Sequence, residues 1–164
     1  MAGTFTASVI AHDVKRSDGD LLAIKMGITK IWKGDNVVLK TDGYCYSAYS
    51  AGAAGDQFVG VAAETKDNRY TNEGDSSSAA AAVGDRRCAC WQNGIVEREC
   101  PAGTVFATDL GLACYCAVGT NDADNPRAVI TSTGGKETAC GRIVDIVSTY
   151  VVRVAISAWG AIEA

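Results

Sequence analysis

The sequence predicts an all-β protein: a single-domain antiparallel β-sandwich or β-barrel with an extended N-terminal arm. Three observations support this fold class. Short runs of β-branched and aromatic residues alternate with Asp-Gly, Gly-Asp and Asn-Gly pairs, which favour tight turns. The 164 residues include 18 Gly but only 2 Pro and show little 3.6-residue periodicity, which disfavours helices. The runs recur about every 8–12 residues, a spacing typical of sandwiches and barrels.

The chain divides into an N-terminal arm or irregular segment, residues 1–27, and a β-rich domain, residues 28–164. Within the arm, residues 4–10 have a composition suited to strand pairing, whereas residues 11–20 are polar and turn-like. Residues 21–26 fit either a strand or a single helical turn. Residues 28–33 alternate apolar and polar side chains and therefore predict a half-buried strand.

The stretch from residue 34 to residue 64 is the centre of the predicted sheet. Its three expected strands, residues 34–40, 44–48 and 57–64, are consecutive and antiparallel. The pair Asp42-Gly43 suits a hairpin turn, because glycine supplies the positive φ angle that the favoured turns require. Residues 65–82 then form a polar surface loop, in which four alanines at 79–82 also allow a brief helical turn.

The second half of the chain repeats this strand-and-turn pattern. Asn93-Gly94 is a strong hairpin signal and predicts that the strands on either side of it pair with each other. The clearest hairpin joins residues 139–147 to residues 150–157, and it places Val152, Val154 and Ile156 on one face. Other strands are expected at residues 104–107, 112–118 and 127–131, with turns at 101–103 and 134–135.

Charge and hydropathy exclude two classes of partner. The formal net charge is −4, whereas phosphate binding needs a basic surface, so we expect no nucleic-acid partner. No run of 18 apolar residues exists, so we expect no membrane partner. The first residues lack a basic segment followed by an apolar one, and we therefore expect the protein to be made and to fold in a reducing cytoplasm.

Seven cysteines are the unusual feature of the composition. Their odd number and the expected cytoplasmic folding disfavour a disulfide framework, so we interpret most of them as buried thiols. A structural zinc site is an alternative, because residues two apart on a strand point to the same face. A buried or interface disulfide is another alternative. The zinc candidates are Cys88, Cys90, Cys114 and Cys116.

No residue pattern predicts catalysis or a cofactor. The single histidine, His12, lies in a polar segment without a nucleophile motif nearby, and we expect it to be solvent-exposed. Residues 121–125 offer several oxygen ligands but lack the glycine and distal glutamate of a calcium loop, so turn formation explains them better. Trp32, Trp91 and Trp159 are expected in the core or at a protein interface rather than on a sugar-binding platform.

The order of motifs between residues 28 and 157 resembles the small decoration, or cement, proteins of tailed-bacteriophage heads. The motifs are Gly34-Asp35, Gly43-Tyr44, residues 58–62, a polar loop, Gly84-Asp85 before a strand ending at Trp91, and a final hairpin from residues 141–144 to residues 152–156. The resemblance implies a structural virion protein without catalysis, made in the host cytoplasm. It would bind the outer capsid surface, often as a trimer, and stabilise contacts between major capsid subunits.

The arm fits this resemblance as a contact with a neighbouring subunit, either lying against it or adding a strand to its sheet edge. The residues expected at that interface are Thr4, Phe5, Thr6, Val9 and Ile10. Two alternatives remain: a β-sandwich module that binds carbohydrate or a receptor, and a structural protein of the tail or fibre.

Overall fold

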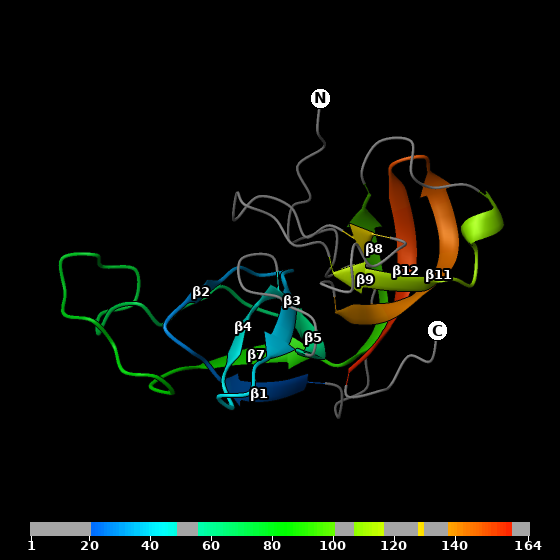
Figure 1. The fold of residues 1–164 in the computed structure, drawn as a ribbon. Helices are drawn as coiled ribbons and strands as arrows, with labels where there is room; N and C mark the ends of the chain where they lie inside the picture. The colour runs from blue at the N-terminus through cyan, green and yellow to red at the C-terminus, as the bar shows by residue number, and fades with distance from the viewer. Residues whose placement is uncertain (1–20, 49–55, 101–106, 117–127, 130–137, 159–164) are drawn as a thin grey trace.

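The structure is a computed structural model, and it describes residues 21–48, 56–100, 107–116, 128–129 and 138–158 (Figure 1). Within these ranges the chain forms twelve strands and one short 3₁₀ turn, η1 (Ala107–Asp109), so the predicted all-β class is confirmed. No helix in the described part is long and apolar enough to cross a membrane. The arm up to residue 20 and the turns expected at 101–103 and 134–135 lie outside the described residues.

The first sheet has the strand order β1-β7-β5-β3-β4 and is antiparallel throughout. Its strands are β1 (Leu21–Lys25), β3 (Asn36–Leu39), β4 (Cys45–Ser47), β5 (Gln57–Ala62) and β7 (Arg87–Trp91). A bridge between Met26 and Cys45 joins its two edges, and the amide of Gly27 donates to the Cys45 carbonyl oxygen at 3.1 Å. The sheet therefore curls onto itself like a small barrel, and we call it the barrel sheet.

The interior of the barrel sheet is apolar. Its buried residues are Ile24, Met26, Ile31, Val37, Cys45, Val59, Ala62, Cys88 and Cys90. Strand β5 is buried from Phe58 to Ala62, because one of its faces lines this interior and the other covers a second core. Burial on both faces explains why the sequence of β5 is almost uninterrupted in its apolar character.

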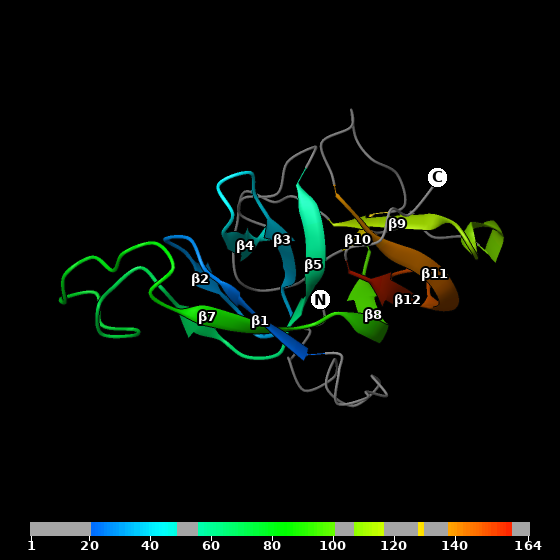
Figure 2. The same ribbon diagram turned by 90° about the horizontal axis from the view of Figure 1, so that it is seen from below.

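The second sheet has the order β10-β9-β11-β12-β8. Its strands are β8 (Asn93–Glu99), β9 (Ala113–Cys116), β10 (Ala128–Val129), β11 (Ala139–Ser148) and β12 (Val151–Ser157). The predicted C-terminal hairpin is confirmed as β11 paired with β12, and Val152, Val154 and Ile156 are all buried. Figure 2 shows this sheet beside β5 of the barrel sheet.

The two sheets share a core. Val38, Phe58 and Val61 of the barrel sheet pack against the inner face of the second sheet. The second sheet contributes Val96, Cys100, Cys114, Cys116, Cys140, Ile143, Val152, Val154 and Ile156. We call this layer the inter-sheet core. The fold thus combines a curled sheet with sandwich-like packing between two sheets.

The hairpin predicted at Asn93-Gly94 is wrong. Asn93 and Gly94 are the first two residues of β8, which lies in the second sheet, whereas β7 lies in the barrel sheet. Gly94 has φ 135° and is paired with Ile156, within a ladder of seven residue pairs between β8 and β12. The long ladder outweighs the local turn preference, so the chain crosses between sheets at Gln92 instead of reversing.

Three predicted segment boundaries also differ from those in the structure. The arm boundary at residue 27 is too late, because residues 21–25 are strand β1 of the barrel sheet. The strand expected over 28–33 shortens to β2 (Lys30–Ile31), which pairs with β6 (Lys66–Asp67). The strand expected over 104–107 does not reach its last residue, because Ala107 begins η1.

Candidate functional site

A polar segment, residues 64–86, extends away from both sheets between β5 and β7 (Figure 1). We call it the excursion. It includes residues 65–82, where the sequence predicts a surface loop, but residues 66–67 form strand β6 and the four alanines form no helical turn. Residues 71–77 at its tip are all exposed. The tip carries two acidic residues, Glu73 and Asp75, and neither Lys nor Arg, so its formal charge is negative.

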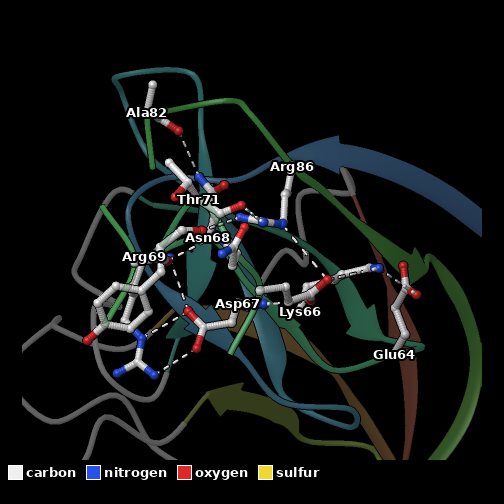
Figure 3. Close-up of polar contacts among 12 residues, drawn as sticks. Glu64, Lys66, Asp67, Asn68, Arg69, Thr71, Ala82 and Arg86 are labelled. Carbon is white, nitrogen blue, oxygen red and sulfur yellow. Dashed lines mark hydrogen bonds and ion pairs between the residues drawn. The ribbon is translucent and has the colours of Figure 1, made fainter. Parts of the chain in front are cut away.

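The base of the excursion is fastened by one buried side chain, that of Asn68. Its Nδ2 donates to the carbonyl oxygens of Gly27 at 3.0 Å and of Ala82 at 3.1 Å (Figure 3). Its backbone amide donates to the Thr29 carbonyl oxygen at 2.9 Å. Asn68 therefore ties the outgoing limb to the returning limb and both of them to the barrel sheet.

The ion pair between Arg69 and Asp67 fixes the same turn. Arg69 donates through Nε to Asp67 Oδ1 at 2.9 Å and through Nη2 to Oδ2 at 2.7 Å, a bidentate geometry (Figure 3). The amide of Arg69 also donates to Oδ1. Donation by the Arg69 side chain lowers the pKa of the Asp67 carboxyl group below its ordinary value.

A second charged group braces the middle of the excursion. Arg86 donates through Nη1 to the Tyr70 carbonyl oxygen and through Nη2 to that of Thr71, both at 2.7 Å. Glu73 accepts the Asp67 amide at 3.0 Å, and its other oxygen lies 3.8 Å from both Lys66 Nζ and Arg86 Nε. The side chains thus hold a segment that has little regular secondary structure (Figure 3).

Local turns order the tip itself. The hydroxyl and amide of Ser77 both donate to Asp75 Oδ1, at 2.6 and 2.9 Å, which lowers the pKa of Asp75. The amide of Asn72 donates to Ser78 Oγ, and the amide of Thr71 to the Ala79 carbonyl oxygen at 2.7 Å. The exposed tip is consequently preorganised rather than dependent on a partner for its shape.

Replacing Asp67 with asparagine is expected to lower stability near neutral pH, by an amount that shrinks in acid. The folded pKa of Asp67 is lowered, so the stability that it contributes is complete above the unfolded value of about 3.9 and is lost as pH falls through the folded value. Urea unfolding of both proteins between pH 2 and pH 7 measures this. A difference that stays constant down to pH 2 would contradict it.

The zinc candidates do not converge on one site. Cys88 and Cys90 lie in the barrel interior, whereas Cys114 and Cys116 lie in the inter-sheet core. Within the described residues, no group of three or more His, Cys, Asp or Glu side chains has an arrangement that could hold a metal ion. All seven cysteines are buried, as the sequence predicts for residues that pack as small apolar side chains.

Several sequence candidates lie outside the described residues. They are the arm residues Thr4, Phe5, Thr6, Val9 and Ile10, together with His12, residues 121–125 and Trp159. The other two tryptophans have different neighbours. The ammonium of Lys30 lies 3.5 Å from the centre of the Trp32 ring, and Trp91 lies opposite Leu21 and Val61 in the barrel sheet. One ring face of Trp32 is thus covered by a cation, which disfavours its use as a sugar-stacking surface.

Sequence reasoning located the excursion but missed the residues that order it. Asn68 reaches Gly27, 41 residues earlier, and no local pattern indicates such a contact. The Asp67-x-Arg69 spacing was the one available signal, because a short acidic side chain readily accepts bonds from the backbone and side chain two residues later.

Comparison with protein-family models and with curated proteins found no match to this chain. The site therefore rests on its geometry. That geometry is an exposed projection whose turns are ordered by hydrogen bonds and ion pairs among its own residues.

Proposed function

We propose that this protein is a structural binding module that docks on the outside of an assembled bacteriophage head and stabilises contacts between neighbouring major capsid subunits. The observation that carries the proposal is the preorganised excursion, whose exposed tip is held by bonds to its own base. Because hydrogen bonds and ion pairs within the excursion order it, binding would lose less conformational entropy than it would with a flexible loop. The negative tip favours a basic patch on the partner.

The attachment points of the arm and the excursion support a clamp. Strands β1 and β7 are antiparallel, with Leu21 opposite Trp91 and Lys25 opposite Arg87. The arm joins the sheet at Leu21, and the excursion joins it at Arg87, so the two segments enter this ladder from opposite ends. Two contacts attached at opposite ends of one rigid ladder suit a module that holds two subunits together.

Assembly of several copies of the protein would increase its affinity for a shell. A homotrimer would present several arms and excursions to the repeated surface of a shell, and linked contacts raise the overall affinity well above that of each contact. In this proposal the arm, with Thr4, Phe5, Thr6, Val9 and Ile10, supplies a strand or an apolar contact to a neighbouring subunit. The protein then resides on the virion surface and needs neither a cofactor nor a catalytic group.

Loosening the excursion tests its role in docking. Asn68→Ala removes the bonds to Gly27 and Ala82, and we expect about tenfold weaker binding to shells, equivalent to about 1.4 kcal/mol. Hydrogen exchange of residues 69–81 should rise at the same time. Asn93→Ala, at an exposed position of β8, is the matched control and should leave both quantities unchanged.

Removing residues 1–12 tests the other half of the clamp in the same binding assay. We expect the truncated chain to keep its fold and to reach a lower occupancy on shells at equal concentration. Faster exchange in the Asn68→Ala variant with unchanged shell affinity would exclude the excursion from docking, and unchanged occupancy of the truncated chain would exclude the arm.

A further inference from the structure

Three cysteines converge in the inter-sheet core. Cys114 and Cys116 are two residues apart on β9 and point to the same buried face. On the neighbouring strand β11 the register shifts between Ala139 and Gly141, so Cys140 is the additional residue of a β-bulge. The Sγ atom of Cys140 lies 3.3 Å from the carbonyl oxygen of Cys114, and all three cysteine side chains belong to the inter-sheet core.

The only buried arginine of the described residues lies beside these thiols. Arg98 of β8 has no exposed surface, and its charge acts on Cys114, Cys116 and Cys140. Hydrogen bonds from Cys114 and Cys116, aided by the positive charge of Arg98, hold the pKa of Cys140 below its usual range despite burial. A thiolate is the nucleophilic form of cysteine, so this environment favours reaction at Cys140.

We propose that Cys140 forms a disulfide with Cys114 or Cys116 when the folded protein meets hydrogen peroxide, which would link β11 to β9 inside the core. The bulge on β11 brings Cys140 against β9, with its Sγ atom 3.3 Å from the Cys114 carbonyl oxygen, and a disulfide typically joins residues whose Cα atoms are about 4.4–6.8 Å apart. Cys140 lies next to both possible partners, so one bond forms at a time. The inference concerns the isolated chain and is independent of docking.

The reaction balances with the peroxide as oxidant. The sulfur of Cys140 attacks one peroxide oxygen, the O–O bond breaks, and with the thiol proton the second oxygen leaves as water. The resulting sulfenic acid is attacked by the sulfur of Cys114 or Cys116. The S–S bond forms as the S–O bond breaks, and a second water leaves. Two thiols are oxidised by two electrons, and one peroxide is reduced to two waters.

The barrel interior holds the comparison group. Cys45, Cys88 and Cys90 are equally buried, whereas the buried Arg98 acts on the three cysteines of the inter-sheet core. Burial raises the pKa of Cys45 to about 12, and the hydrogen bond with Cys88 together with burial raises that of Cys90. These thiols should react more slowly than Cys140.

The experiment treats the reduced full-length protein with hydrogen peroxide, blocks the remaining thiols by alkylation, and maps the peptides without reduction. We expect a loss of two free thiols from seven and a cross-link from Cys140 to Cys114 or Cys116. The bond closes a loop of about 25 residues, so the thermal midpoint should rise by about 5–10 °C and return after treatment with dithiothreitol.

Variants identify the shared cysteine. Cys140→Ser should lose the cross-link and the thermal shift, whereas Cys90→Ser, the matched control in the barrel, should keep both. Should Cys140→Ser fold poorly, Cys114→Ser and Cys116→Ser replace it: each should still cross-link through the remaining cysteine, and their combination should not. Seven free thiols after peroxide, a cross-link between other cysteines, or further oxidation of Cys140 without a cross-link would each overturn the proposal.

Discussion

Replacing Arg98 with alanine is expected to destabilise the protein by about 2–5 kcal/mol, the range typical of truncating a large buried side chain to alanine. Its guanidinium group is fully buried, yet it makes three directed bonds. Nε and Nη2 donate to Asn36 Oδ1 at 3.2 and 2.9 Å, and Nη1 donates to the Glu97 carbonyl oxygen at 3.1 Å. Asn36 belongs to β3 of the barrel sheet and Arg98 to β8 of the second sheet, so this contact ties the two sheets together.

The alanine variant loses this tie and leaves a cavity in the inter-sheet core. Urea unfolding at pH 7 measures the change, and two variants make it interpretable. Arg98→Met should cost less than half as much, because both variants lose the buried cation and its hydrogen bonds but only the alanine leaves most of the side-chain volume empty. Arg87→Ala, at an exposed position of β7, should cost less than about 1 kcal/mol. An equal loss of unfolding free energy in Arg98→Ala and Arg87→Ala would show that Arg98 does not stabilise the contact between the two sheets.

Gly60→Ala is the second change with a large expected effect, a loss of about 3 kcal/mol or more. Gly60 has φ 134°, a conformation that L-residues rarely adopt and that costs about 1–3 kcal/mol. A Cβ atom there would lie 2.3 Å from the Trp91 carbonyl oxygen, and the rigid backbone of β7 has no easy way to move. Overpacking of this kind costs about 1–3 kcal/mol more.

Gly74→Ala is the matched control for this substitution. Gly74 also has a positive φ, 80°, but a Cβ atom at that position would meet nothing within 4 Å. Its cost should therefore be about 1–2 kcal/mol, the conformational part alone. Thermal unfolding of the two variants separates the cost of a positive φ angle, which both variants share, from the cost of the steric clash, which only Gly60→Ala has. A smaller loss for Gly60→Ala than for Gly74→Ala would contradict the close approach of β5 and β7.

Local pattern was enough to predict the strands whose partners are close in sequence. Strands β3 and β4 pair across Asp42-Gly43, and β11 pairs with β12, because in each case the turn chemistry and the alternation agree. The hairpin prediction at Asn93-Gly94 was wrong because there the turn preference and the strand pairing disagree. Its turn preference competes with a ladder to β12, which begins 58 residues after Asn93 and which local sequence does not reveal.

Arg98 shows a signal that could have been used. Alternation along β8 places Val96, Arg98 and Cys100 on one face, and all three are buried. The acidic neighbours Glu97 and Glu99 make the segment look solvent-exposed. Because Arg98 is also charged, the sequence gives the impression that its side chain lies at the surface. Its acceptor Asn36 lies 62 residues away, which no spacing rule predicts.

The sequence predicted where the excursion lies in the chain but not the contacts that order it. Its polar composition indicates a surface loop, and the bonds that make it rigid arise only once β2 and β6 pair and bring Gly27 and Ala82 to Asn68. Preorganisation, the property on which the proposed function rests, is therefore a product of tertiary structure.

The most direct test of the proposed function is the amount of this protein on purified bacteriophage particles. Particles are banded in a density gradient, and the protein is quantified against the major capsid protein. The proposal predicts a fixed ratio of copies, removal of the protein by mild treatment that leaves the shell intact, and return to the same ratio when the purified chain is added back. Absence of the protein from the banded particles would contradict a role on the capsid surface.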